Sequence, residues 1–292
     1  MKKIKKILIS IILFSSIIVI LFSCNVIWKS PSFYDVKKNK ELITPIMDMD
    51  AYKDIWQTHR RPYCYSIGST KSKGKVHVLG VEHLTDPNHS QFDTIRNLWN
   101  QTNPTVALVE GRLGFLFTWF QNPIEKYGEG GLVSELAKED GINLYTWEPT
   151  RNDEIEILMK QFSVEKIAMF YSFRPYFSNM RHGKPKNPEK KLEDYLKSRT
   201  DYDYIRDVFQ SWEELDSVWQ KDFPDIEWRD YSDEQGWPKG YLYEIWNASN
   251  LSRDFHLIQT ITELVEKGET VFVTMGASHA PRIENALKAM IK

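Results

Sequence analysis

Short apolar runs alternate with amphipathic segments over most of this chain, and this alternation is the feature that most constrains its fold. Each run has the length of a buried strand, and in the segment that follows it the apolar residues recur at helical spacing. The predicted strands are 75–80, 105–109, 142–147 and 270–275, and the predicted helices are 88–100, 131–138, 251–265 and the residues from Pro281 onward. Because strands that alternate with helices pair in parallel, the sequence predicts an α/β fold with a mostly parallel central sheet flanked by helices.

Residues 150–248 interrupt this alternation, since they contain no convincing strand pattern. Segments 153–161, 164–180 and 192–219 have helical patterns instead. We therefore expect a large helical insertion in the α/β domain. It holds five of the ten tryptophans, which either pack helices against one another or form an aromatic wall over a substrate cleft.

The N-terminus has the pattern of a secretory signal peptide, which we assign to residues 1–23. Its lysines precede an apolar run, Ile7–Phe22, that is shorter than the roughly 20 residues of a membrane-spanning helix. The run ends just before Cys24 and resembles a bacterial lipoprotein signal, in which the cysteine is lipidated after cleavage; an uncleaved signal anchor is the alternative. Both interpretations predict a body in the cell envelope, outside the cytoplasm and attached to a bacterial membrane. Residues 24–58 are then a tether and a first helix, and 59–292 form the α/β domain.

Charge and cysteine content exclude two classes of protein. All 40 acidic side chains but only 34 of the 38 basic ones follow residue 23, so the body has no excess of positive charge with which to bind nucleic acid. With Cys24 and Cys64 alone, the chain has no disulfide framework. We interpret Cys64 as a small buried apolar residue.

Polar residues follow each predicted strand where it ends. Glu82 and His83 follow the first strand, Glu110 the second, Glu148 the third and His279 the last. Because the carboxyl ends of parallel strands lie along one edge of a sheet, where ligands bind, these side chains are expected to converge. The first and last turns share the pattern Gly-x-x-His, although each histidine taken alone has a structural alternative as a hydrogen-bonded turn residue.

The residue types at this edge are those of hydrolytic sites. A neutral imidazole can take a proton from water, and a neighbouring carboxylate can orient that imidazole. Two histidines and a carboxylate are also a ligand set for a catalytic divalent metal, here His83, Glu110 and His279. The residues by themselves leave both alternatives open.

Four further residues are secondary candidates. Arg253 either stabilises an oxyanion or is an ordinary charge on a helix surface. Glu148 either joins the site or caps the helix that follows it. Glu82 and His89 are additional candidates for the site, with an ordinary solvent-exposed position as the alternative.

These motifs resemble those of the TraB/GumN/Tiki family, which belongs to a wider group with the erythromycin esterases and the ChaN-like haem-binding lipoproteins. The resemblance covers residues 76–110 and 251–287 and places the family's motif residues at His83, Glu110, Arg253 and His279. The resemblance to Tiki-like members implies a metal-dependent peptidase that uses manganese or cobalt. The resemblance to erythromycin esterases implies metal-free ester hydrolysis by a histidine base.

We therefore expect an exported, lipid-anchored hydrolase that cleaves a peptide or ester bond with water activated at His83, Glu110 and His279, supported by Arg253. The alternative is a ChaN-like lipoprotein that binds haem or a metal without turnover, because the Glu82–His83 pair and the nearby His89 resemble that version of the first motif. A third alternative keeps the fold and serves as a binding or signalling module.

Overall fold

The computed structural model describes residues 4, 7, 11–16 and 27–291, and these form two compact units. The sheet unit comprises the described residues up to Glu148 and from His256 onward, and the helical unit comprises Pro149–Phe255. Most of the predicted signal peptide and the predicted lipidation site, Cys24, lie outside the described residues. Within the described part of the chain, no helix has both the length and the apolar character needed to cross a membrane.

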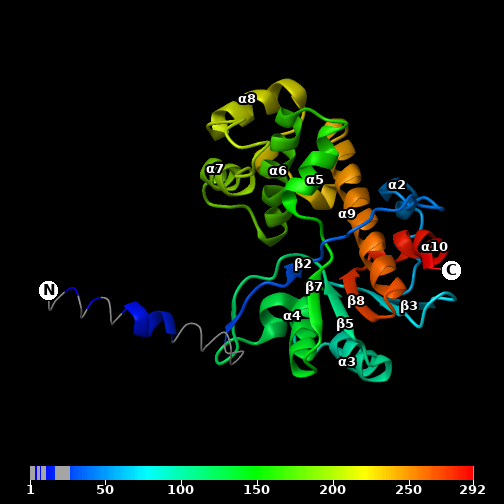
Figure 1. The fold of residues 1–292 in the computed structure, drawn as a ribbon. Helices are drawn as coiled ribbons and strands as arrows, with labels where there is room; N and C mark the ends of the chain where they lie inside the picture. Colours follow the sequence, from blue (N-terminus) through cyan, green and yellow to red (C-terminus); the bar gives the residue numbers. More distant parts are fainter. Residues whose placement is uncertain (1–3, 5–6, 8–10, 17–26, 292) are drawn as a thin grey trace. The chain divides into compact units, whose positions relative to one another are not determined.

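A six-stranded sheet forms the centre of the sheet unit (Figure 1). Its strands, in spatial order, are β2 (Ser32–Phe33), β7 (Asn143–Thr146), β5 (Val106–Val109), β8 (Thr270–Gly276), β4 (Lys75–Val81) and β3 (Tyr63–Gly68). All neighbouring strands run parallel except β3, which pairs antiparallel with β4 at one edge. The predicted α/β class with a mostly parallel sheet is therefore confirmed. A separate antiparallel pair joins β1 (Ile27–Trp28) to β6 (Leu116–Phe117).

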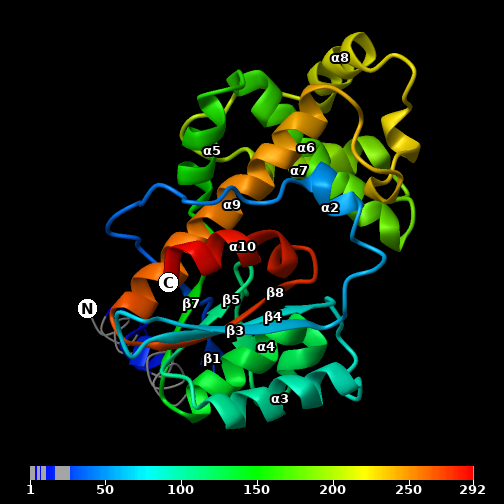
Figure 2. The same cartoon turned by 90° about the vertical axis from the view of Figure 1, so that its right-hand side faces the viewer.

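Helices cover both faces of the six-stranded sheet (Figure 2). One face packs against α3 and α4, and the other packs against α10 and the C-terminal part of α9. The bounds are Ser90–Thr102 for α3, Pro123–Glu139 for α4, Tyr241–Glu266 for α9 and His279–Ile291 for α10, and a short helix, α2 (Met49–Lys53), precedes β3.

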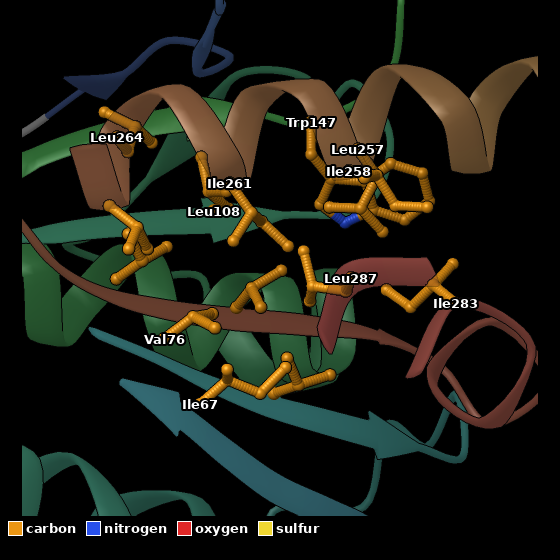
Figure 3. Close-up of a cluster of buried hydrophobic side chains, with 14 of the residues drawn as sticks. Ile67, Val76, Leu108, Trp147, Leu257, Ile258, Ile261, Leu264, Ile283 and Leu287 are labelled. Carbon is orange, nitrogen blue, oxygen red and sulfur yellow. The ribbon is translucent and has the colours of Figure 1, made fainter. Parts of the chain in front are cut away.

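The strands carry two apolar cores because alternate residues of a strand point to opposite faces. In β4, Val76 and Val78 pack with α9 and α10, whereas Leu79 and Val81 pack with α3 and α4. Figure 3 shows the first of these cores, with Val76 on the strand side and the α9 side chains above it. Strands buried on both faces are apolar throughout, which explains why the sequence showed continuous apolar runs.

The order of the strands places a topological switch point beside β8. This strand is the last in the sequence but lies between β5 and β4. The chain leaves β4 and β5 through α3 and α4 on one face and enters β8 from α9 on the other face. Ligands of open α/β sheets bind at the carboxyl ends of the strands at such a point.

The helical unit has its own core. Its helices are α5 (Arg151–Met159), α6 (Val164–Asn179), α7 (Pro188–Arg199), α8 (Trp212–Asp222) and the first part of α9, with 3-10 helices at Met180–His182, Trp228–Asp230 and Asp233–Gln235. Trp219 is fully buried, with its ring centroid 4.6 Å from that of Phe173 and 4.7 Å from that of Phe223. For Trp219 and the equally buried Trp228, packing between helices is therefore the correct interpretation.

Three predicted helices are wrong in their extent. The helix predicted for 251–265 is longer, since α9 begins at Tyr241. The predicted helix 192–219 is two helices, because α7 ends at Arg199 and the segment 200–211 that follows contains a residue with a left-handed backbone, Asp207 (φ 61°). Helix α4 begins at Pro123, ahead of the predicted start at residue 131, since the Asn122 side chain accepts the Ile124 N–H at 2.8 Å and caps the helix there.

Candidate active site

Three of the residues singled out in the sequence meet at the carboxyl edge of the sheet. His83 follows β4, Glu110 follows β5, and His279 opens α10 directly after β8. The His83 Nε2 atom lies 3.8 Å from Oε2 of Glu110, and the His279 Nε2 atom lies 3.7 Å from its Oε1. Each imidazole therefore faces one oxygen of the same carboxylate.

The position of Glu110 is fixed by the backbone of β8. The Gly276 N–H donates a hydrogen bond to Glu110 Oε2 at 2.6 Å. A Cβ atom at Gly276 would lie only 2.9 Å from His83 Nε2 and 3.3 Å from Glu110 Oε2. The glycine of this second Gly-x-x-His turn therefore lets the strand approach the site closely.

The glycine of the first turn has a different role. A Cβ atom at Gly80 would lie 2.7 Å from the Cβ of Ala280, on α10. Gly80 thus allows α10 to pack closely on β4. The two turns look alike in sequence, but only the second glycine contacts the polar cluster.

A buried carboxylate that sequence reasoning missed holds His83 in place. The His83 Nδ1 atom lies 2.7 Å from Oε1 of Glu129, a buried residue of α4. Glu129 directly follows Gly128, which breaks the helical geometry of α4 (φ 54°, ψ −134°). A Cβ at Gly128 would lie 2.6 Å from the Leu84 carbonyl oxygen, so the glycine brings α4 against the loop that carries His83.

The contact with Glu129 determines which nitrogen of His83 carries the proton. A carboxylate accepts hydrogen bonds, so the proton of the neutral ring is on Nδ1 and Nε2 carries the lone pair. The His83 side chain is 61% exposed, whereas those of Glu110 and Glu129 are 16% and 7% exposed. The basic nitrogen thus belongs to an accessible imidazole beside one buried carboxylate, Glu129, and one partly buried carboxylate, Glu110.

His279 is held differently. Its side chain is buried, and its ring lies edge-on to the ring of Trp147 with 5.3 Å between centroids. The Trp147 indole N–H donates to the Thr274 carbonyl at 3.1 Å, and the His256 Nδ1 atom lies 2.7 Å from the Trp147 carbonyl oxygen. Strand β8 and the end of β7 therefore fix the wall against which His279 packs.

The secondary candidates lie in other settings. Glu82 is exposed and forms an ion pair with Arg61, at 3.0 Å between Oε1 and Nη1. His89 is exposed at the N-cap of α3, where its Nδ1 accepts the Gln91 N–H at 3.2 Å. Glu148 is partly buried after β7, and its N–H donates to Thr146 Oγ1 at 3.4 Å.

Two alternatives from the sequence are corrected at this point. The cap of α5 is Thr150, whose side chain accepts the Asp153 N–H, so Glu148 is not the helix cap. Arg253 is only 6% exposed and belongs to the helical unit, where it interacts electrostatically with Glu154 and Arg174. It is therefore not an ordinary charge on a helix surface.

The cluster has the donor types of a metal site, but its donor atoms lie slightly farther apart than the ligands of one bound tetrahedral ion. Two imidazoles and a carboxylate suit a divalent ion, and the hydrogen bond from His83 to Glu129 is the support that metal-bound histidines use. Ligands of one tetrahedral ion lie about 3.4 Å apart. The corresponding distances of 3.8 and 3.7 Å are wider, and among the residues described here no group of three His, Cys, Asp or Glu side chains is gathered closely enough to hold an ion.

Comparison of the chain with protein-family models, with curated proteins and with solved structures found no match. The geometry of the cluster formed by His83, Glu110, Glu129 and His279 is therefore the main indication of function.

Proposed function

We propose that this protein is a hydrolase that cleaves a peptide or ester bond with water activated at His83. The observation that carries the proposal is the 2.7 Å contact between His83 Nδ1 and the buried Glu129, which directs Nε2 of an exposed imidazole toward Glu110. A histidine oriented by a carboxylate is the usual form of a general base. The resemblance to the erythromycin esterases implies the same histidine chemistry, and the resemblance to Tiki-like members implies its metal-dependent counterpart.

The residues of the cluster would supply the proton transfers of a hydrolytic cycle. His83 Nε2 accepts a proton from water while the water oxygen bonds to the carbonyl carbon. The carbon–nitrogen or carbon–oxygen bond then breaks, and the proton passes from the imidazolium to the leaving amine or alcohol. Glu129 and Glu110 stabilise the positive charge on His83 in between, and His279 faces the other oxygen of Glu110.

A divalent ion is compatible with this proposal on the basis of donor types. His83, Glu110 and His279 would hold it, and Glu129 would orient His83. When bound, manganese or cobalt would lower the pKa of a water molecule and polarise the substrate carbonyl. Glu129 would still orient His83, but the Nε2 atom of His83 would then bind the ion instead of accepting the proton from water.

The decisive experiment compares the full chain with His83→Ala and Glu129→Gln on a panel of chromogenic esters and peptides, with and without added Mn²⁺ or Co²⁺. We expect both variants to lose about 10²-fold or more in kcat/KM, because each removes the oriented base. His89→Ala is the matched control and should retain full activity, since His89 caps α3. Hydrolysis by His83→Ala at the rate of the unaltered chain would contradict the proposal.

The alternative of a haem-binding lipoprotein without turnover is tested by the absorption spectrum of the same preparation. His89, the extra histidine of that alternative, already uses its Nδ1 atom to cap α3. A Soret band that His89→Ala abolishes would favour the haem protein. Metal bound to the chain and lost in a His83→Ala/His279→Ala variant would favour the metal-dependent hydrolase.

We also propose that the body lies outside the cytoplasm and is attached to a bacterial membrane through the N-terminal segment, with a lipid on Cys24. Support for this comes from the lysine-rich start, the apolar run and the cysteine that follows it.

A further inference from the structure

An exposed aromatic loop stands out on the sheet unit, between β5 and α4. We call residues 113–121 the aromatic loop; it contains β6. Phe115, Trp119 and Phe120 are 59%, 76% and 65% exposed. Burying large aromatic rings is strongly favourable, so a group of them in water marks a surface that contacts something else.

The loop is held in this exposed arrangement by its own contacts. The Gln121 side chain accepts the Phe117 N–H at 2.9 Å, and the Tyr127 hydroxyl donates to the Phe115 carbonyl at 3.0 Å. The Phe120 ring stacks on Phe117, and the Trp119 ring lies edge-on to Phe120 at 5.4 Å. The rings of Phe117, Trp119 and Phe120 therefore form one structured surface patch.

The chain itself places this patch next to the predicted membrane attachment. Strand β6 pairs with β1, with Phe117 opposite Ile27 and Leu116 opposite Trp28. Cys24 precedes Ile27 by three residues, which is at most about 11 Å of chain. A lipid on Cys24 would place the bilayer within that reach of β1, and an uncleaved apolar segment that ends at Phe22 would place it within about 18 Å.

A cavity lined by residues of β1 and of the aromatic loop places positive charge next to the aromatic patch. It has a volume of about 230 Å³ and is lined by Lys29 and Lys138, with no acidic side chain among the described residues that line it. The Lys138 ammonium group lies over the Trp28 ring, 5.3 Å from its centroid. Burial and the nearby Lys29 lower the pKa of Lys138, so a negatively charged group in the cavity would relieve repulsion between the two lysines.

We propose that the aromatic loop and the cavity of Lys29 and Lys138 together form a docking surface for an anionic lipid bilayer. Phe115, Trp119 and Phe120 enter the interfacial layer, which aromatic side chains prefer, and the two lysines attract anionic headgroups. The surface would hold the body in a fixed orientation on the membrane and add affinity to a single lipid chain, which by itself binds only weakly. This inference uses the membrane attachment proposed above and is independent of the hydrolytic site.

The test uses the full chain reconstituted into vesicles of phosphatidylethanolamine and phosphatidylglycerol, in which part of the lipid carries brominated acyl chains that quench tryptophan on contact. We expect quenching of the unaltered chain and loss of most of it in Trp119→Phe. Trp56→Phe is the matched control, because Trp56 is 48% exposed elsewhere on the sheet unit, and it should change nothing. All three proteins should float with the vesicles.

Three outcomes would overturn the proposal. If the unaltered chain does not float with the vesicles, both the attachment and the docking surface are wrong, while the hydrolase assays are unaffected. If it floats but Trp119 is quenched only by aqueous acrylamide, the loop remains in water. If Trp119 is shielded from both quenchers, a second copy of the chain or another protein covers the loop.

The role of the lysines is tested by replacing the anionic lipid. Quenching should be weaker in phosphatidylcholine vesicles than in vesicles with the anionic lipid. The double variant Lys29→Gln/Lys138→Gln should show nearly the same quenching in both kinds of vesicle. Lys71→Gln, at an exposed lysine outside the cavity, should preserve that difference. Equal quenching of the unaltered chain in both lipids would overturn the assignment of the cavity to anionic headgroups.

Discussion

At the scale of single residues, Gly276 gives the sharpest test of the site, because it touches two of its members without contributing a side chain. In Gly276→Ala the new Cβ would lie 2.9 Å from His83 Nε2, so the imidazole must move away from its present position. A displacement of this kind costs on the order of 10²-fold in rate, and we expect kcat to fall accordingly. The measurement is kcat together with urea unfolding.

The control for this change is Gly68→Ala, since a Cβ at Gly68 has open space around it. It should preserve both activity and stability. Gly276 does not have a left-handed backbone, so its replacement should affect rate far more than stability. Unchanged kcat in Gly276→Ala would show that the position of His83 does not matter for the reaction.

The candidate site could be predicted only in part from the sequence. His83, Glu110 and His279 follow strands, so a parallel sheet alone was enough to place them at one edge. Glu129 lies inside a helix, and its approach to His83 depends on the backbone of Gly128 and on packing between α4 and the loop after β4. The only indication in the sequence was that Glu129 lies between two glycines. Only the fold shows which of the many glutamates contacts a histidine.

At the scale of elements, the kink of α4 links stability to the site. In Gly128→Ala the backbone would keep a φ of 54°, and the Cβ would lie 2.6 Å from the Leu84 carbonyl oxygen. The unfavourable backbone costs about 1–3 kcal/mol, and the steric conflict adds to it. We expect a lower free energy of unfolding in urea, together with reduced activity because Glu129 no longer reaches His83.

Gly141→Ala separates backbone strain from the steric conflict. Gly141 follows the end of α4 and also has a positive φ of 66°, but a Cβ there meets nothing within 4 Å. This variant should lose stability, by about 1 kcal/mol, and keep full activity. If Gly128→Ala and Gly141→Ala lost activity equally, the kink would have no special connection to His83.

The elements themselves were predicted best where apolar residues recur regularly. The strands around Val78, Leu108 and Val273 were evident because both of their faces are buried. The first half of α4 was missed, since its glycines lower helix propensity and hide the period. Strand β3 was not predicted either, and its place at the sheet edge depends on antiparallel pairing with β4, which its own residues do not specify.

At the scale of the whole molecule, the two units depend on different interactions, and Glu154 belongs to the helical unit alone. It lies buried on α5, forms an ion pair with Arg151 and accepts a hydrogen bond from Ser249 of α9. Burial by itself would raise the pKa of Glu154, but Arg151, Arg174, the hydrogen bond from Ser249 and Arg253 outweigh burial and lower it. The ionised carboxylate therefore stabilises the packing of α5 against α9 in this unit.

A lowered pKa means that the folded helical unit favours the ionised Glu154. Its contribution to stability is complete above the ordinary pKa of 4.5 and is lost as the pH falls below that value through the lowered pKa. In Glu154→Gln, the buried guanidinium groups lose the negative charge that neutralises them. We expect the free energy of unfolding of the helical unit to fall by about 3–5 kcal/mol at neutral pH. The difference in free energy of unfolding between Glu154→Gln and the unaltered chain should shrink as the pH falls below 4.5.

Hydrogen exchange followed by mass spectrometry checks this prediction unit by unit. Amides of α5 and α6 should lose protection in Glu154→Gln at neutral pH, whereas those of α3 and α10 in the sheet unit should keep theirs, because the units have separate cores. Glu213→Gln, at an exposed residue of α8, is the control and should leave both units unchanged. Equal loss of protection in both units would mean that the molecule unfolds as one cooperative body, and the hydrolytic site would then depend on Glu154 as much as on its own residues.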